Sequence, residues 1–177
     1  MPPDPIEATR RWLERAVIGL NLCPFAKAVH AKGQVRYVLS GATTPEALLE
    51  DLGEALLHLR DAPAEEVDTT LVVHPGVLAD FLDYNDFLAQ ADALVAELGL
   101  EGVLQVASFH PGYQFAGTAP DDAGNFTNRS PYPTLHLLRE ASVTRAVATY
   151  PDPDAIIDRN IDTMQRLGAG GLRDLLS

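Results

Sequence analysis

The sequence predicts an α/β protein with a small, mainly parallel sheet of three to four strands covered by helices. Short apolar or β-branched runs alternate along the chain with amphipathic helical patterns, which is the order that builds parallel sheets with helical crossovers. Two of the apolar runs end in the same tripeptide, His-Pro-Gly, and proline stops a central strand. A length of 177 residues fits a single domain over 1–177.

In the first third of the chain, we predict a helix, a strand and a second helix. Asp4 before Pro5 is typical of a helix N-cap with proline in the first turn, and the helix should end near Asn21, ahead of the Cys23-Pro24 step. Residues 35–39 form a short strand. Thr43 or Thr44 then caps a helix with a leucine stripe, and the segment 61–63 ends it.

The middle of the chain repeats this alternation. The β-branched run 69–73 is a strand, and a long helix follows from about Val77 to Leu98, closed by Gly99. Asp80, Asp83 and Asp86 recur at a spacing of three on its wet side, where a metal cluster is an alternative interpretation. The third strand covers 103–109.

After this strand comes a polar connection of about twenty residues, from His110 to Ser130. Residues 113–116 could add a short strand at an edge of the sheet. Ser130-Pro131 is expected to open a helix carrying Leu135 and Leu138. Asp152-Pro153 should open the last long helix, with Gly168 past its end and a short helix after Gly171.

The charge of the chain argues against two classes of partner. The formal net charge is -12, and the segment 61–128 contains no Lys or Arg but twelve carboxylates. Such a surface repels phosphate backbones and anionic lipid, so we expect no nucleic acid and no membrane as partners. With a single cysteine, no basic-apolar leader and no long apolar stretch, the sequence favours the cytosol.

The two His-Pro-Gly turns are the first candidate site. If the strands before them are parallel, His74 and His110 emerge at the same edge of the sheet, the edge at which open α/β sheets place ligands. The alternative is that each imidazole only caps the end of its strand. His110 has the richer polar neighbourhood, and we interpret it as a candidate general acid or base.

The connection after His110 supplies candidate substrate-binding residues. Arg129, just before the predicted helix start at Ser130, could receive a carboxylate or phosphate. His136 and Arg139 would share a face early in that helix, with Glu140 able to orient His136. Further polar contacts would come from Gln114, Asn125 and Asn128. Alternatively, Ser130 is only a cap, Arg129 pairs with Asp121 or Asp122, and His136 is a satisfied core residue.

Cys23 is the remaining candidate for chemistry. It could be a nucleophile if Lys27 or a helix terminus lowers the pKa of its thiol. It could also join His110, His74, His136 or Asp122 as a metal ligand, since thiolate and imidazole suit zinc or iron. A buried cysteine that acts only as a small apolar side chain is the third interpretation.

Four blocks of the sequence resemble a known family: LCPFA at 22–26, QVASFHP at 105–111, NFTNRSPYP at 125–133 and LHLLRE at 135–140. They are similar to the bacterial family catalogued as domain of unknown function 1415, over nearly the whole chain. The resemblance implies a bacterial stand-alone protein, and it implies no reaction, cofactor or catalytic residue.

Three hypotheses for function follow. The leading one is an enzyme, or an enzyme-like binding protein, for a small anionic molecule held by Arg129 and the residues around His110. The second keeps the location but places a metal ion on a Cys/His set. The third is a non-catalytic regulatory or assembly module that uses the polar connection to contact a protein. No phosphate-binding loop, dinucleotide fingerprint, nucleophile elbow or HExxH motif is present in the sequence.

Overall fold

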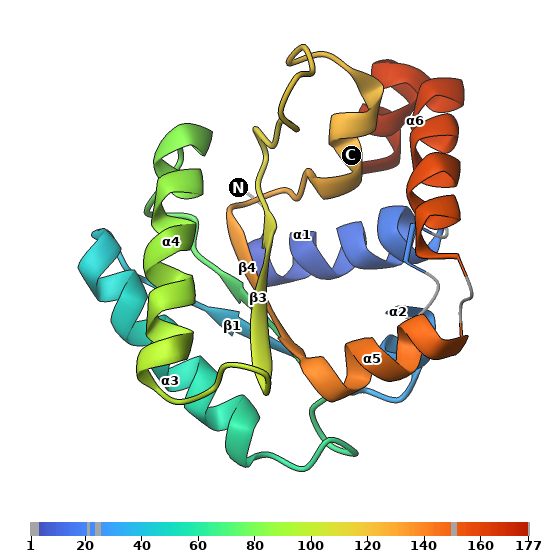
Figure 1. Ribbon diagram of the computed structural model, residues 1–177. Coiled ribbons are helices and arrows are strands. Elements are labelled where there is room, and N and C mark those ends of the chain that lie inside the picture. The colour runs from blue at the N-terminus through green and yellow to red at the C-terminus, as the bar shows by residue number, and fades with distance from the viewer. Residues whose placement is uncertain (1–3, 21, 24–25, 150–151, 177) are drawn as a thin grey trace.

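A computed structural model describes residues 4–20, 22–23, 26–149 and 152–176. One four-stranded sheet lies between two helical layers, with α3 and α4 on one face and α1, α2, α5 and α6 on the other (Figure 1). The strands are β1 (Val35–Leu39), β2 (Thr69–Val73), β3 (Leu104–Phe109) and β4 (Thr134–Arg139). The α-helices are α1 (Pro5–Trp12), α2 (Ala26–Ala31), α3 (Pro45–Asp61), α4 (Phe81–Glu97), α5 (Glu140–Thr149) and α6 (Pro153–Leu176). A π-helical turn, η1 (Leu13–Ile18), extends α1, and a 3-10 segment, η2 (Ala123–Asn128), lies in the connection before β4.

The expectation of a mainly parallel sheet is wrong. The strand order is β1-β2-β4-β3; β1 and β2 are parallel, whereas β4 is antiparallel to both of its neighbours. Because β2 and β3 each oppose β4, they run in the same direction as β1. The expected direction of the first three strands is therefore confirmed, and a fourth strand fills the position between β2 and β3.

This inserted strand replaces the helix predicted to begin at Ser130. Residues 130–133 are irregular and residues 134–139 form β4, after which α5 begins at Glu140. When an apolar run is buried on both faces, its sequence pattern does not distinguish a helix from a strand. Here the segment forms a strand because it can hydrogen-bond to both β2 and β3. The short strand suggested for 113–116 does not form.

The helix ends largely follow the caps read from the sequence. The side chain of Asp4 accepts a hydrogen bond from the backbone N–H of Ile6 at 2.9 Å, and Thr44 accepts one from Ala47 at 3.2 Å. Helix α4 begins four residues later than predicted, because Asp80 caps it through the N–H groups of Leu82 and Asp83. In α6, Gly168 has a φ of 67°, which interrupts the helix where the sequence predicts an end.

Two predicted features fall partly outside the described residues. Asn21 and Pro24, which bound the expected end of the first helix, are among those not described; the π-helical turn that extends α1 ends at Ile18. Helix α2 follows this segment and was not predicted. Within the described residues, no helix is both long and apolar enough to cross a membrane.

The larger core lies between the sheet and the α3–α4 layer. Its leucine stripe is Leu48, Leu52, Leu56 and Leu59, which are all fully buried, and it packs with Leu135 and Leu137 of β4. Burying each such side chain contributes about 1.5–3 kcal/mol to folding.

On the opposite face, a smaller core forms around Trp12 and Val17, which pack with Val35, Tyr37 and Phe109. Trp12 meets the Phe109 ring edge to face at 5.0 Å between ring centroids.

Candidate functional site

His74 and His110 emerge at the same edge of the sheet, as the two His-Pro-Gly turns predict. Tyr84 of α4 lies between them, with its ring centroid 5.8 Å from that of His74 and 4.8 Å from that of His110. Both histidines are buried, with exposed fractions of 0% and 1%. They belong to the side of the sheet that α4 covers, so neither faces open solvent.

The ring nitrogens of His110 are both occupied. Nε2 donates to the carbonyl oxygen of Leu78 at 2.9 Å, and Nδ1 accepts from the backbone N–H of Gly112 at 2.9 Å. Burial lowers the pKa of His110, so the ring is held neutral in this tautomer. The arrangement is that of a strand-end cap that fixes two turns, and it leaves no ring nitrogen for a substrate.

His74 has one free ring nitrogen, but it is sealed in the core. Nδ1 lies 3.1 Å from the carbonyl oxygen of Val77, while Nε2 is buried without a hydrogen-bond partner among the described residues. Burial lowers the pKa of His74 to about 4. Since this atom is buried away from solvent, the geometry gives His74 a structural place.

The polar connection after β3 is organised by its own side chains. Asn125 is fully buried; its Oδ1 accepts from the N–H of Phe115 and the hydroxyl of Thr118, and its Nδ2 donates to the carbonyl of Ala119. Gln114 donates to the carbonyl of Thr118 at 2.6 Å. These bonds make the segment an ordered loop, and they engage the oxygen and one of the two Nδ2 hydrogens of the Asn125 amide.

Arg129 closes the same loop from its C-terminal side. Its Nε donates to the carbonyl of Tyr113 at 2.9 Å, one terminal nitrogen donates to the carbonyl of Pro120, and the guanidinium lies 4.6 Å from the centroid of the Phe126 ring. No ion pair joins Arg129 to Asp121 or Asp122 in the described structure. The helix N-terminus expected beside Arg129 does not exist, so the anion receptor cannot be built in that way.

The neighbours of Arg129 are likewise bonded to the backbone. Asn128 donates from Nδ2 to the carbonyl of Ser108 at 3.1 Å and accepts at Oδ1 from the hydroxyl of Thr127. Ser130, which is buried, donates to the carbonyl of Tyr132 at 2.6 Å. Both residues therefore anchor the approach to β4.

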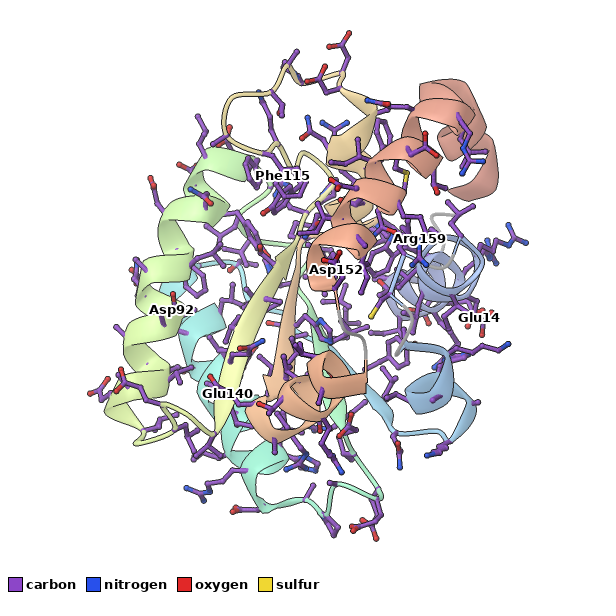
Figure 2. All side chains as sticks on the ribbon, turned by 45° about the vertical axis from the view of Figure 1, so that its right-hand side comes forward. Glu14, Asp92, Phe115, Glu140, Asp152 and Arg159 are labelled. Carbon is purple, nitrogen blue, oxygen red and sulfur yellow. The ribbon has the colours of Figure 1, made fainter. Side chains whose placement is uncertain are left out.

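Arg139 lies at the far end of the sheet from this loop. Its guanidinium donates to the carbonyls of Val67 and Ala62, at distances down to 2.7 Å, and so holds the turn before β2. Figure 2 shows this separation, with Glu140 and Phe115 labelled at opposite ends of the sheet. Arg139 cannot join a site at the His110 edge.

His136 points away from His110. It lies on β4, opposite Leu71 of β2 and Ala107 of β3, on the face of the sheet that α1 covers, whereas His110 packs against Phe81 and Tyr84 of α4. The two imidazoles thus lie on different sides of the sheet, and the single hollow expected between them does not form. The interaction of His136 with Glu140 also requires a helix that is absent.

The tautomer of His136 follows from its partner Thr69. The hydroxyl of Thr69 has one hydrogen, which it donates to the carbonyl of Leu137 at 2.7 Å, and its oxygen lies 2.7 Å from Nε2 of His136. Nε2 must then carry the proton and donate to Thr69, which leaves Nδ1 as an acceptor. No described residue hydrogen-bonds this Nδ1. Burial lowers the pKa of His136 to about 4, so the ring is neutral near pH 7.

His136 forms part of the floor of a cavity of about 360 Å³, which we call the sheet cavity. The cavity lies between the sheet and the layer formed by α1, η1, α2 and α5. Its walls are mostly apolar, and its polar members are Cys23, Asp68, Thr69, Gln105, His136 and Ser142. Trp12, the only tryptophan of the chain, also lines it.

A second cavity of about 660 Å³, the loop cavity, lies between the loop of residues 115–128 and α6. Asp122, Asn125 and Asn128 line it from the loop, and Asn160 and Gln165 line it from α6. Cys23 lines both cavities. The structure therefore brings Cys23 together with His136 in one cavity and with two of the predicted asparagines in the other.

Several residues that line these cavities were missed by the sequence analysis. Thr69, Trp12 and Asn160 reach their places through strand register and helix packing, which no local pattern in the sequence reveals.

The described residues contain no group of three or more His, Cys, Asp or Glu side chains arranged to hold a metal ion. Asp80, Asp83 and Asp86 have separate places: Asp80 caps α4, and the other two are exposed.

Comparison with known proteins gives a family and nothing more specific. No curated protein and no solved structure shows significant similarity to the chain. The model of a family described as "Protein of unknown function (DUF1415)" matches residues 4–174. The chain therefore belongs to the DUF1415 family.

Proposed function

We propose that the protein binds a small, mostly apolar molecule in the sheet cavity, through a hydrogen bond from the molecule to Nδ1 of His136. The observation that carries this proposal is an imidazole acceptor without a partner among the described residues, on the floor of a largely apolar cavity. A volume of about 360 Å³ lies within the size range of small-molecule sites, which combine apolar walls with a few fixed polar groups.

The charges around the sheet cavity favour a neutral ligand. Its described lining includes the carboxylate of Asp68, which accepts from the hydroxyl of Ser142 at 2.6 Å, and includes no Lys or Arg. An anion would lose its hydration there without gaining a positive partner. The small anionic molecule expected from the sequence therefore finds less support here than a neutral molecule with a hydroxyl or an N–H group.

The sheet cavity also contains two side chains that a catalytic function would need. Cys23 and His136, both candidates for chemistry on the sequence, line the same cavity, so a substrate bound there would lie beside both side chains. The neutral imidazole can accept a hydrogen bond at Nδ1, and in a reaction it could accept a proton at the same atom. Of these two roles, we assign to Nδ1 of His136 the acceptance of a hydrogen bond from the ligand. A cytosolic place for such a binding protein stays a prediction from the sequence.

Two probes with nearly the same carbon skeleton distinguish the contribution of the hydrogen bond to binding from that of apolar contacts with the cavity. Menthol can donate a hydrogen bond, whereas menthone can only accept one. Emission from Trp12, which lines the cavity, reports binding of either probe. We expect menthol to bind about two- to tenfold more tightly than menthone, because one neutral hydrogen bond contributes about 0.5–1.5 kcal/mol.

The variants His136→Leu and His58→Leu provide the matched test. His136→Leu should bind the two probes equally, since it keeps the apolar cavity and removes the acceptor. His58 is exposed on α3, so its replacement should leave the preference for menthol unchanged. If neither probe alters Trp12 emission, or if His136→Leu still prefers menthol, the proposed function is wrong.

A further inference from the structure

A second polar side chain of the sheet cavity lacks a partner. Gln105 of β3 is half-buried and lines the cavity, and its amide makes no hydrogen bond to another described residue. A glutamine amide carries two N–H donors and a carbonyl acceptor, so it can bond to most neutral polar groups. Between mostly apolar walls, such an amide gains most from a ligand that brings a polar group of its own.

The register of the sheet places Gln105 close to His136. Ala107 of β3 lies opposite His136 of β4, and Gln105 lies opposite Leu138. Because side chains two positions apart in a strand point to the same face, Gln105 and His136 are diagonal neighbours on the floor of the sheet cavity. Strand positions related in this way are about 7–8 Å apart, which a compact ligand with a polar group at each end can span.

The other hydrogen-bonding side chains nearby are engaged or farther away. The hydroxyl of Thr69 already makes the two bonds described above. Ser142 donates to Asp68 at 2.6 Å. Asp68 is three residues from the β2 position that faces His136, whereas Gln105 is two residues from the β3 position that does so. Gln105 is therefore the nearer partner for a ligand that is already bonded to His136.

We propose that the ligand of the sheet cavity is a compact, neutral diol: one hydroxyl donates to Nδ1 of His136, and a second hydroxyl, across the apolar body, bonds to the amide of Gln105. This inference rests on the proposed function, because the first of these hydrogen bonds is the one assigned there. It adds the second polar group and the residue that selects it. A hydroxyl suits this amide because it can donate to the carbonyl oxygen or accept from an N–H, and because it brings no charge into the cavity.

Two probes that differ by one hydroxyl test the second bond without any variant. p-Menthan-8-ol and p-menthane-1,8-diol have the same carbon skeleton, and the diol adds a hydroxyl on the opposite side of the ring. If Gln105 receives this hydroxyl, the diol should bind about two- to tenfold more tightly, the gain expected from one neutral hydrogen bond. Without a partner, the added hydroxyl would lose its hydration and weaken binding by about tenfold or more. Emission from Trp12, which lines the cavity, measures both dissociation constants.

The variants Gln105→Leu and Gln90→Leu assign the second bond to a residue. Gln105→Leu removes the amide and leaves an apolar side chain, so it should reverse the preference and bind the mono-alcohol more tightly. Gln90 is exposed on α4, which covers the other face of the sheet (Figure 1), so Gln90→Leu should keep the preference for the diol. Asp68→Asn should also keep it, because Asp68 is engaged by Ser142 and lies farther from His136.

Failure of this inference can be told apart from failure of the proposed function. The role of Gln105 is overturned if the native protein binds the diol no more tightly than the mono-alcohol, if Gln105→Leu keeps the preference for the diol, or if Asp68→Asn loses it. In each case the preference for menthol over menthone still tests His136 as the acceptor. That preference, measured on Gln105→Leu, also shows that the variant is folded. If menthol does not bind to the native protein, the proposed function is wrong and this inference falls with it.

Discussion

His110 bonds to Leu78, a residue with a left-handed backbone: the Nε2–H of His110 reaches the Leu78 carbonyl oxygen at 2.9 Å, and Leu78 has a φ of 60°. Left-handed geometry is costly for a residue with a Cβ, by roughly 1–2 kcal/mol, so the surrounding contacts must hold it. His110 is one of those contacts, which makes it a structural residue whose loss should be felt in stability.

The variant His110→Ala should therefore destabilise the protein by about 2–5 kcal/mol. It removes a buried ring beside Phe81 and Tyr84, and it leaves the Leu78 carbonyl and the Gly112 N–H without partners. Urea unfolding at neutral pH measures the change, and folded His110→Ala should still bind menthol. Near-normal stability combined with lost binding would return His110 to the functional site.

The two His-Pro-Gly turns should respond differently to a methyl group. A Cβ on Gly76 would lie 3.0 Å from the backbone carbonyl oxygen of Ala42, which cannot easily move, whereas one on Gly112 would make ordinary contacts of 3.5 Å with His110 and Phe81. We expect Gly76→Ala to lower the free energy of unfolding by about 1–3 kcal/mol and Gly112→Ala to change it by less than about 1 kcal/mol. Equal effects in thermal unfolding would show that the close approach to Ala42 is unimportant.

Stability should fall as the solution becomes acidic, because of the buried histidines. The pKa values of His74 and His136 are about 4 in the folded protein, below the ordinary value of 6.5. Between these pH values the two imidazoles are protonated in the unfolded chain but not in the folded protein. The free energy of unfolding therefore decreases as pH falls from about 6.5 to about 4, and it levels off below that. Each histidine contributes up to about 3 kcal/mol of this loss.

Urea midpoints measured across that pH range test this expectation. His136→Gln should flatten part of the curve, since glutamine does not titrate, while the exposed His58→Gln should leave the curve unchanged. A native protein whose stability stays constant over the range would contradict the burial of these two rings.

Arg129→Ala should loosen the loop without unfolding the sheet. Its guanidinium donates to the carbonyls of Tyr113 and Pro120, so its removal releases the loop 112–128 at both of these points. Arg129→Lys should restore little, because an ammonium cannot copy the guanidinium fork. Hydrogen exchange by mass spectrometry should show faster exchange within 112–128 and unchanged exchange in β2. Protection of the loop in Arg129→Ala would refute this role.

The strands and helix caps that depend on local sequence pattern could be predicted. Strand β4 could not, because it depends on pairing with strands that are distant in the sequence. The β-branched run of β2 and the helix cap at Thr44 can each be recognised from a few neighbouring residues. In contrast, Leu135 and Leu138 fit a helical spacing as well as they fit a strand. The segment becomes strand β4 because α4 connects β2 to β3 in such a way that a position for one strand remains between them.

The candidate site was found in part for a similar reason. Cys23 and His136 were recognised as chemically capable residue types, and they do line one cavity. Their meeting depends on the packing of the N-terminal helices over β4, which has no counterpart in local sequence. His110 was over-interpreted, because a polar neighbourhood along the chain says nothing about whether ring nitrogens are already bonded.

The central position of β4 ties the order of synthesis to the order of folding. β2 and β3 share no hydrogen bonds with each other; β2 pairs with both β1 and β4, whereas β3 pairs with β4 alone. On the ribosome, β1 and β2 can pair early, but β3 has no partner strand until residues 134–139 emerge. The hydrogen-bonded network of the sheet is consequently completed by the last of its strands to be made, and the floor of the sheet cavity arrives with it.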